Sequence, residues 1–479
     1  MPPIKLAIVG GGPSAFYLAS RLLSLLPKTD SQGSNLRVHV YDRLWAPHGL
    51  VRYGVAPDHP EVKNATHKFD QAAADERFRF FGNIQVGAQS PPSIPHALRL
   101  PLSSLFSHYT HLVFSTGCTI PTLHSALPPS HLVSPALCLV HWYTHHPSNP
   151  VPPPLDKISH ATLIGQGNVS LDIARMLLTN PAILEKYDVP EHVLNVLRRS
   201  AVQHVSIVGR RGPLQAAFTT KELREMMCLT EASMTPIEPS LLNPSQEMTR
   251  QQTRTMQLLT KGSVNKPGTT RKTWSLDFFR SPTRLVAPTS GAMQLTLAHT
   301  SLDERARSVP TGENSTLSTD FVVTSLGHHA DPAQTFYEPS TGTIRASSGR
   351  VIDSAGRALK NVYASGWAAM GARGVLASTM LDAYAVADTI LSDQFATGSE
   401  LTTMSVPAPA YEEERPMAIE ADLESLPNEV EAGIRDCRIM DYEQWKVVDV
   451  EEIRRGQLNG KERERMDWYE ARKVLDQAK

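Results

Sequence analysis

The sequence predicts an α/β fold of two Rossmann-like dinucleotide-binding domains, with the second domain inserted into the first. An apolar strand, a glycine turn and an amphipathic helix occur in residues 4–26 and again in residues 161–178. Strand-like segments resume after residue 320, as expected if the second unit interrupts the first. We therefore expect residues 1–118 and 327–479 to build the first domain, the latter part with a C-terminal extension, and residues 119–326 to build the second.

Composition limits the function classes. The 479 residues suit two or three domains, and 41% apolar with 20% charged residues is typical of a soluble globular protein. The formal net charge of -1 gives the whole chain no electrostatic attraction to nucleic acid or to an anionic membrane. The four cysteines lie far apart without a C-x-x-C pair, which excludes a single-loop zinc or iron–sulfur site and a dithiol redox motif. No apolar run reaches the length of a membrane span, and the start "MPPIKLAIVGGG" leaves no room for a transit peptide before the first strand.

The first unit carries the motif G-x-G-x-x-A from Gly10 to Ala15, directly between a strand and a helix. Gly10 permits the tight turn, and Gly12 lets the backbone approach a pyrophosphate at the helix N-terminus. The next strand, "LRVHVYDR", ends in Asp42, whose carboxylate would bind a ribose. The alternative is a turn in which glycine serves packing alone.

The remaining elements follow in order. "HLVFSTGC" (111–118) predicts another strand, and the prolines across residues 121–154 indicate a crossover between domains. The polar composition of residues 230–320 predicts a less ordered segment. "FVVTSLGHH" (321–329) and "NVYASGW" (361–367) predict further strands, the second followed by a glycine-rich turn and a long helix. Nine acids against two arginines in residues 411–436 indicate a solvated surface segment.

The second unit repeats the glycine turn as "GQGNVS" (165–170), but "HVSIVGRRG" places Arg210 and Arg211 where the first unit has Asp42. Guanidinium groups pair bidentately with a 2'-phosphate, whereas an aspartate would repel it. The arginines therefore favour NADPH over NADH. One acidic and one basic site imply two nucleotides, most naturally FAD and NADPH, and hydride transfer between them. The alternative is two solvated arginines at a strand end.

Several stretches resemble the adrenodoxin reductase family, the mitochondrial-type NADPH:ferredoxin reductases. They are "HGLVRYGVAPDHPEVKN" (48–64), "LIGQGNVSLDIARMLL" (163–178), "VGRRGPLQAAFTTKELREM" (208–226), "FFRSP" (278–282) and "SGWAAMGARGVLASTM" (365–380). The resemblance covers nearly the whole chain. It implies the same fold and an FAD-dependent NADPH:ferredoxin oxidoreductase.

The resemblance also implies which residues meet the two nucleotides. The residues along the FAD are Gly10, Gly12, Pro13, Ser14, Ala15, Asp42, Gly49, Leu50, Val86, Trp367, Gly374 and Val375. The residues along the NADPH are Gly165, Gln166, Gly167, Asn168, Val169, Arg210, Arg211 and Glu222. A helix beginning near Val375 would point its positive end at the flavin. Core packing is the competing interpretation for Trp367.

His59 and Asp172 match a polar pair that the family places near the flavin and the nicotinamide. We expect them to orient groups or relay protons, because hydride transfer itself needs no protein base. A hydrogen-bonded structural histidine in a proline-rich turn is the competing interpretation for His59.

The electron acceptor is expected to be another protein, because this chain has no cysteine cluster for an iron–sulfur centre. Residues 246–284 hold eight lysines or arginines against two acids, which would attract an acidic [2Fe-2S] ferredoxin. We expect docking near Arg224, Arg250 and Arg254, although "EMTRQQTRTM" (247–256) is a thinner basic run than the family's and a solvated basic loop would look the same. The ferredoxin would receive electrons one at a time for a P450 or for iron–sulfur and haem biosynthesis.

The resemblance implies a mitochondrial location, in the matrix or on the matrix side of the inner membrane. Two rival functions use the same nucleotides. An FAD/NADPH-dependent monooxygenase would deliver the electrons to oxygen, and a nucleotide-sensing flavoprotein would bind FAD but show negligible turnover.

Overall fold

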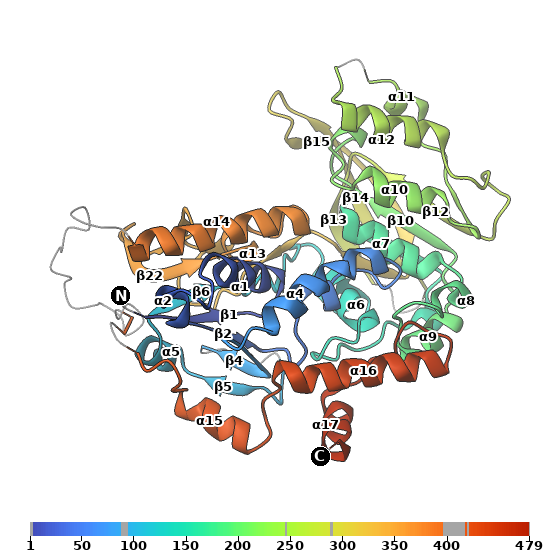
Figure 1. Cartoon of the computed structure of the whole chain (residues 1–479). Coiled ribbons are helices and arrows are strands. Elements are labelled where there is room, and N and C mark those ends of the chain that lie inside the picture. The colour runs from blue at the N-terminus through green and yellow to red at the C-terminus, as the bar shows by residue number, and fades with distance from the viewer. Residues whose placement is uncertain are drawn as a thin grey trace.

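The computed structural model describes residues 3–87, 94–244, 247–287, 291–395, 417–418 and 421–478, which form two lobes (Figure 1). The first lobe is built on a seven-stranded sheet. Its strands in spatial order are β20 (Ala346–Ser347), β21 (Arg350–Ile352), β22 (Ala358–Ala364), β6 (His111–Phe114), β1 (Ile4–Val9), β2 (Leu36–Asp42) and β3 (Phe78–Gly82). The late strand β22 pairs in parallel with the early strand β6, so both ends of the chain build this sheet.

Helices cover both faces of the first sheet. The first face is covered by α1 (Pro13–Leu25), α4 (Thr66–Ala73) and α14 (Leu376–Phe395). The other face is covered by α5 (Leu102–His108), α13 (Trp367–Met370) and α15 (Asn428–Arg435). Helix α1 buries Phe16, Ala19 and Leu22 at helical spacing, which is the apolar face expected from the sequence.

The second lobe has a six-stranded sheet whose paired strands all run parallel. The spatial order is β11 (Ala232–Met234), β12 (Lys272–Asp277), β10 (His204–Val208), β9 (His160–Ile164), β16 (Phe321–Thr324) and β8 (Val133–Pro135). One face carries α6 (Ala136–Tyr143), α7 (Asn168–Leu178), α9 (Glu191–Arg198), α10 (Thr220–Met227) and α12 (Arg250–Lys261). The predicted fold class, two Rossmann-like units with the second inserted into the first, is confirmed.

The opposite face of the second sheet corrects the prediction for residues 230–320. The described residues of this region, 230–244, 247–287 and 291–320, include an antiparallel sheet of β13 (Arg280–Val286), β14 (Met293–Leu302) and β15 (Ser308–Thr319). Met293, Leu295 and Leu297 alternate along β14 and pack against the parallel sheet. The polar composition was misleading because β15 exposes most of its residues to solvent.

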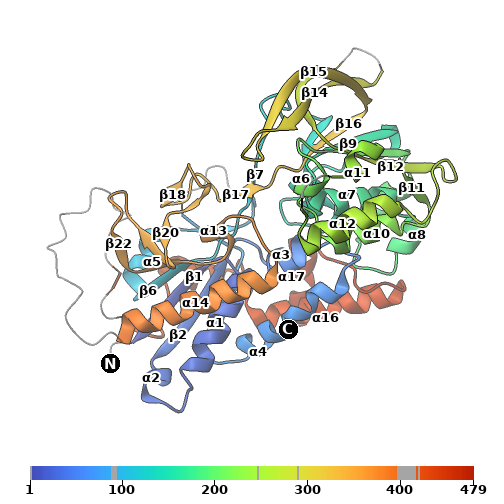
Figure 2. The ribbon, with the colours of Figure 1, turned by 90° about the horizontal axis from the view of Figure 1, so that it is seen from above.

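Shorter elements complete the lobes. They are α2 (Ser31–Ser34), α3 (Leu50–Tyr53), the 3-10 turns η1 (Pro60–Ala65), η2 (Leu155–Lys157) and η3 (Pro213–Gln215), α8 (Pro181–Leu184), α11 (Pro239–Leu242), β4 (Ile84–Val86), β5 (Leu98–Leu100), β18 (Tyr337–Glu338) and β19 (Thr343–Ile344). The two chain crossings between the lobes pair as β7 (Ile120–Pro121) and β17 (His328–His329), and Figure 2 shows this ribbon between them. Among the described residues, no helix combines the length and apolar character needed to cross a bilayer.

The C-terminal extension spans both lobes. Figure 1 shows α16 (Tyr442–Leu458) running beneath them, with α17 (Trp468–Gln477) below it. Glu452 of α16 forms a buried ion pair with Arg52 of the first lobe at 2.7 Å. Arg465, between α16 and α17, forms a buried ion pair with Asp188 of the second lobe. The extension therefore joins the lobes through buried charge pairs.

The acidic segment 411–436 is only partly a solvated surface. Residues 411–416 and 419–420 lie outside the described residues. Farther along, Leu426 and Val430 are buried in the core of the first lobe, and the carbonyl of Ser425 accepts a hydrogen bond from the buried Lys5 ammonium at 2.6 Å. The apolar residues between the acids, which composition alone obscures, anchor this segment.

Candidate functional site

The turn after β1 has the geometry that its glycines predict. Gly10 has a φ of +103°, and a side chain there would overlap the carbonyl oxygen of Ser115, which follows the neighbouring strand β6. A Cβ at Gly11 would lie 2.7 Å from Asp42 Oδ2. At Gly12 an added Cβ would meet no atom within 4 Å. The first two glycines are therefore needed for packing, and the third faces open space at the start of α1.

Asp42 lies directly beside this turn. Its carboxylate accepts hydrogen bonds from the backbone N–H of Gly11 at 2.7 Å and of Leu44 at 2.9 Å. The residue is 6% exposed, and burial raises the pKa of its carboxyl to about 6. The acid at the end of β2 thus faces the same space as the glycine turn.

A cleft opens at this turn and holds about 920 Å³ of space, part of which is open to solvent. Its walls include eight of the residues predicted to lie along the first nucleotide: Gly10, Gly12, Pro13, Ser14, Asp42, Gly49, Leu50 and Trp367. Both ends of the chain contribute, because Leu376 and Thr379 of α14 face the cleft beside Trp367.

Four other predicted residues stand outside this lining. Ala15 lies in the first turn of α1 with its side chain buried in the core, and Val86 ends β4 and packs against the core of the opposite sheet face. Gly374 and Val375 are exposed just before α14, which begins at Leu376 as expected from the sequence.

Sequence reasoning also missed part of the cleft wall. The segment after β6 and two histidines of the second lobe line it: Ser115, Thr116, Gly117, Cys118, Thr119, His141 and His146. The strand "HLVF" with its following glycine was the available signal for the first five. His141 belongs to α6, which the prolines of residues 121–154 concealed.

Trp367 is held at the mouth of this cleft. Its indole N–H donates a hydrogen bond to the carbonyl of Arg373 at 3.0 Å, and its own carbonyl accepts one from Cys118 Sγ at 3.1 Å. The preceding Gly366 has a φ of +68° and donates its N–H to Asp382 Oδ2 at 2.5 Å. The ring is therefore fixed by backbone contacts rather than by burial in the core.

The second unit repeats this geometry. Gly165 has a φ of +128°, and a side chain there would overlap the carbonyl oxygen of Ser325, which follows β16. At Gly167 an added Cβ would meet no atom within 4 Å. Asn168 begins α7 and accepts a hydrogen bond from Thr219 N–H at 2.7 Å, while Gln166 donates its side-chain amide to Ile207 at 3.1 Å. The half-buried Val169 packs against the core of this lobe.

Arg210 and Arg211 follow β10 at the same edge of the parallel sheet as the second glycine turn. Both side chains are exposed. The carbonyl of Arg210 accepts hydrogen bonds from the hydroxyls of Thr300 and Ser308, each at 2.8 Å. The antiparallel sheet therefore holds the backbone at Arg210, while both guanidinium groups remain exposed to solvent.

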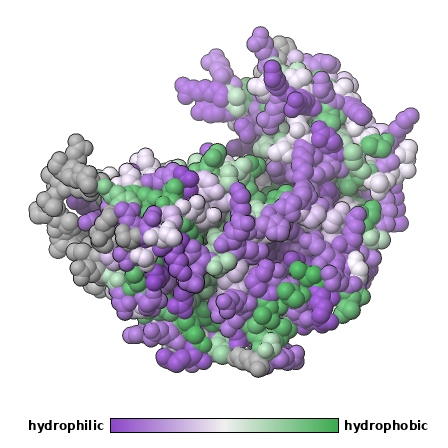
Figure 3. Space-filling model, viewed as in Figure 1, coloured by the Kyte–Doolittle hydropathy of each residue, from purple (hydrophilic) through white to green (hydrophobic). Residues whose placement is uncertain are grey.

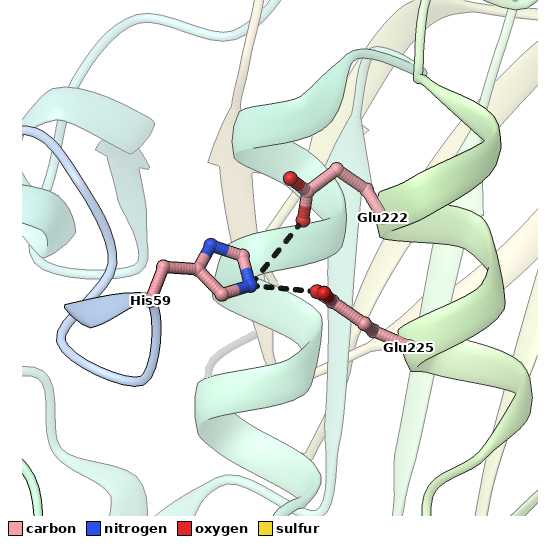
Figure 4. Close-up of side chains that lie close together, drawn as sticks. All are labelled: His59, Glu222 and Glu225. Atoms are coloured by element: carbon pink, nitrogen blue, oxygen red, sulfur yellow. Dashed lines mark hydrogen bonds and ion pairs between the residues drawn. The ribbon is translucent and has the colours of Figure 1, made fainter. Parts of the chain in front are cut away.

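Figure 4 shows His59 facing two glutamates across the boundary between the lobes. His59 precedes η1 in the first lobe, and Glu222 and Glu225 belong to α10 of the second. The Nε2 atom of His59 lies 2.6 Å from Glu225 Oε2 and 3.9 Å from Glu222 Oε2. Thr219 caps α10 by accepting a hydrogen bond from Glu222 N–H at 3.3 Å, which fixes the first turn that carries Glu222.

Arg175 of α7 connects this cluster. Its buried guanidinium lies 2.6 Å from Asp58, 2.8 Å from Asp172, 3.1 Å from Glu222 and 3.3 Å from Glu225. One buried cation therefore faces four carboxylates. Sequence reasoning named neither Arg175 nor Asp58 nor Glu225, although all three stand within the stretches that carry the family resemblance.

Asp172 and His59 belong to the same cluster, and the ion-pair partners of His59 within it are the two glutamates. Burial, against the opposing effect of Arg175 and together with the nearby Glu222, raises the pKa of Asp172 to about 7. Asp172 can therefore exchange a proton near neutral pH.

Comparison with known proteins shows the family to which the chain belongs. No family model matches it. It is 36% identical to the mitochondrial NADPH:adrenodoxin oxidoreductase of Bos taurus over 96% of this chain and 90% of the relative. It is 34% identical to the NADPH-ferredoxin reductase FprA of Mycobacterium tuberculosis over 82% and 84% of the two chains. A solved structure of that FprA in complex with NADPH aligns with a TM-score of 0.81 and 29% identity over 98% of this chain and 99% of the other. The chain belongs to the adrenodoxin reductase family.

Proposed function

We propose that this protein passes electrons from NADPH, through a bound FAD, one at a time to a [2Fe-2S] ferredoxin. One observation carries the proposal. The two units have glycine turns of the same geometry, but the strand after each turn leads to opposite charges: Asp42 in the first unit, and Arg210 with Arg211 in the second. The kinship with NADPH-dependent adrenodoxin and ferredoxin reductases supports the same electron path. Such a pair of sites suits one nucleotide with a bare ribose and one with a 2'-phosphate.

The 920 Å³ cleft is the place for FAD. The open space at Gly12 admits the pyrophosphate to the N-terminus of α1, whose N–H groups attract anions. Asp42 would accept hydrogen bonds from the ribose, while Pro13, Ser14, Gly49 and Leu50 line the path. Ala15 and Val86 lie behind this lining and would support it.

The flavin end lies toward Trp367, Gly374 and Val375. The α14 N-terminus, at Leu376, brings a positive helix end to this side of the cleft. Bound FAD supplies the chemistry that the side chains lack, accepting two electrons together and releasing them singly. The lining residues would enclose the cofactor, and Val375 is exposed to solvent.

NADPH would lie across the second unit. Gly165 and Gly167 admit its pyrophosphate to the N-terminus of α7, beside Gln166, Asn168 and Val169. Arg210 and Arg211 would bind the 2'-phosphate with forked, charge-assisted hydrogen bonds.

The nicotinamide end would reach the cluster of His59, Asp172 and Glu222. These side chains would orient the nicotinamide against the flavin, because hydride transfer requires no protein base. The raised pKa of Asp172, about 7, lets that carboxyl hold a proton near neutral pH. Arg175 keeps the carboxylates in place through its ion pairs.

The ferredoxin would dock on the second lobe. Arg224 on α10 and Arg250 and Arg254 on α12 are exposed, and the two helices pack together. Of the basic stretch 246–284, the structure describes residues 247–284. Figure 3 shows mainly hydrophilic side chains over this lobe. An acidic partner would be attracted here, and its association would weaken with salt.

The domain and cellular assignments follow from the same proposal. Residues 1–118 and 327–479 would form the FAD domain, and residues 119–326 the NADPH domain, with the β7–β17 ribbon at the two crossings. Relatives are named as mitochondrial enzymes, and we infer a mitochondrial location for this chain, in the matrix or peripheral to the inner membrane. There the ferredoxin would supply a P450 or iron–sulfur and haem biosynthesis.

Steady-state reduction of cytochrome c by the FAD-loaded protein tests the proposal, with NADPH or NADH and with or without a mitochondrial-type ferredoxin. We expect strong dependence on ferredoxin and a large preference for NADPH. Arg210→Ala with Arg211→Ala should remove that preference, whereas Arg199→Ala, another exposed arginine of the same lobe, should keep it. NADPH consumption with oxygen that ferredoxin does not change would instead favour the monooxygenase.

A further inference from the structure

We propose that His59, Glu222 and Glu225 form a zinc site between the two lobes whose occupation slows flavin reduction by NADPH. The inhibitory part rests on the proposed function, which places His59 and Glu222 at the nicotinamide. The site itself rests on ligand geometry, on local charge and on access from solvent.

The ligand geometry is close to that of a zinc centre. One ligand atom from each of the three side chains lies within 4.8 Å of the others, and His59 and Glu222 are buried. Zinc holds nitrogen and oxygen ligands at about 2.0–2.1 Å in a tetrahedron, which separates neighbouring ligand atoms by about 3.3 Å. The distances from His59 Nε2, 2.6 Å to Glu225 and 3.9 Å to Glu222, bracket that separation. Because all three separations are at most 4.8 Å, side-chain adjustments of about 1.5 Å or less would complete it.

The side chains approach from opposite sides, which favours a bridging ion. In Figure 4 the imidazole of His59 points from its loop toward α10, and both glutamates point back toward it. Glu222 and Glu225 stand three positions apart, so they share one helix face. An ion held here would bond both lobes at once.

The local excess of negative charge also favours a bound cation. Asp58, Asp172, Glu222 and Glu225 surround the single guanidinium of Arg175. The nearby ammonium of Lys221 lies closer to a carboxylate outside the cluster, Glu61 at 2.6 Å, than to Glu225 at 3.9 Å. Buried carboxylates in excess of their cations are costly unless a proton or a metal ion compensates them.

Solvent can reach the ligands. A second pocket lies between α7, α8 and α10 and holds about 820 Å³ of space, part of which is open to solvent; His59 and Glu225 line it. Further acids, Asp58 and Glu231, line the same pocket. A hydrated cation can therefore approach His59 and Glu225 from this side without opening the FAD cleft.

The ligand set favours zinc over magnesium and calcium. An imidazole with two carboxylates suits zinc, whereas magnesium and calcium prefer sites made of oxygen ligands. The three protein ligands leave a fourth position for water. Bound zinc would hold His59 and Glu222 away from the nicotinamide and would restrict motion between the lobes.

The test measures zinc binding to the tag-free, FAD-loaded protein by competition with a chromogenic zinc chelator. We expect one zinc ion per chain. Glu225→Gln and His59→Gln should each weaken binding at least tenfold. Glu231→Gln, a matched change in the same pocket, should change it less than twofold, as should Cys228→Ser, which removes an exposed thiol from the pocket wall.

The second readout is anaerobic bleaching of the flavin by NADPH. Saturating zinc should slow it at least tenfold in the wild-type protein, EDTA should restore it, and Glu225→Gln should be insensitive relative to its own zinc-free rate. Equal zinc binding by Glu225→Gln, or loss of binding in Cys228→Ser alone, would overturn the site. Normal zinc binding without slower bleaching would overturn the inhibition. A flavin that NADPH does not bleach even without zinc would refute the proposed function, while chelator competition would still decide the zinc site.

Discussion

The substitution Gly167→Ala tests whether Gly167 is needed for binding a cofactor rather than for the fold. Gly167 has φ -107° and ψ 176°, an extended conformation open to alanine, and its Cβ would meet no protein atom within 4 Å. Stability should therefore stay the same or rise by up to about 1 kcal/mol, because alanine reduces the entropy of the unfolded chain. The new methyl group would instead occupy the space proposed for the NADPH pyrophosphate.

The cost to binding follows from the hydrogen bonds at stake. If the methyl group displaces the pyrophosphate from one backbone N–H at the start of α7, about 1.5–3 kcal/mol is lost. The Kd for NADP⁺ should then rise roughly tenfold to 150-fold. FAD content should not change, because Gly167 lies outside the FAD cleft.

Gly165→Ala is the matched control. Its φ of +128° costs a side chain about 1–3 kcal/mol, and overlap with the Ser325 carbonyl adds about 1–3 kcal/mol. Thermal unfolding and calorimetric titration with NADP⁺ distinguish the two variants. Gly165→Ala should lower the Tm, whereas Gly167→Ala should keep it and lose affinity. Wild-type affinity for NADP⁺ in a normally folded Gly167→Ala protein would refute the reasoning.

Three further predictions address docking, pH and the C-terminal extension. The double substitution Arg250→Glu with Arg254→Glu should lower kcat/KM for ferredoxin at least tenfold and make it depend less on salt concentration. The rate of flavin bleaching by NADPH should not change. An unchanged salt dependence of kcat/KM would exclude this surface as the docking site. Because the pKa of Asp172 is raised from 3.8 to about 7, the native state holds a proton that the unfolded chain has lost in that window. Its contribution to stability is therefore complete below about pH 4 and is lost as the pH rises through 7, so urea unfolding of Asp172→Asn should show a shallower decline across this range than the wild type. Arg465→Met should lower the free energy of unfolding by about 3 kcal/mol, as measured by urea unfolding. This is the low end for breaking a buried ion pair, because Lys63 remains 3.0 Å from Asp188. A decrease smaller than that caused by breaking an exposed ion pair would contradict the proposed role of the extension in joining the lobes.

Local features allowed the fold class to be predicted. The glycine turns, Asp42 and the arginine pair each follow a strand within a few residues, so their relative placement depends on the Rossmann unit itself. Patterns that depend on solvent exposure were less informative. The polar strand β15 concealed an antiparallel sheet, and the prolines around α6 concealed a buried helix. In both places composition reflects the exposed side of an element, whereas a few apolar positions decide where it packs.

The sequence by itself determined two strand–glycine turn–helix units and the opposite charges at the ends of their second strands, because those residues are close neighbours along the chain. Only the tertiary structure decided which distant residues share a site. His59 and Glu225 are 166 positions apart and meet at 2.6 Å because the lobes pack against each other there. Arg175 faces four carboxylates for the same reason, since α7, α10 and the segment before η1 converge on it. Such contacts arise from the packing of whole elements, which no local pattern of residues specifies.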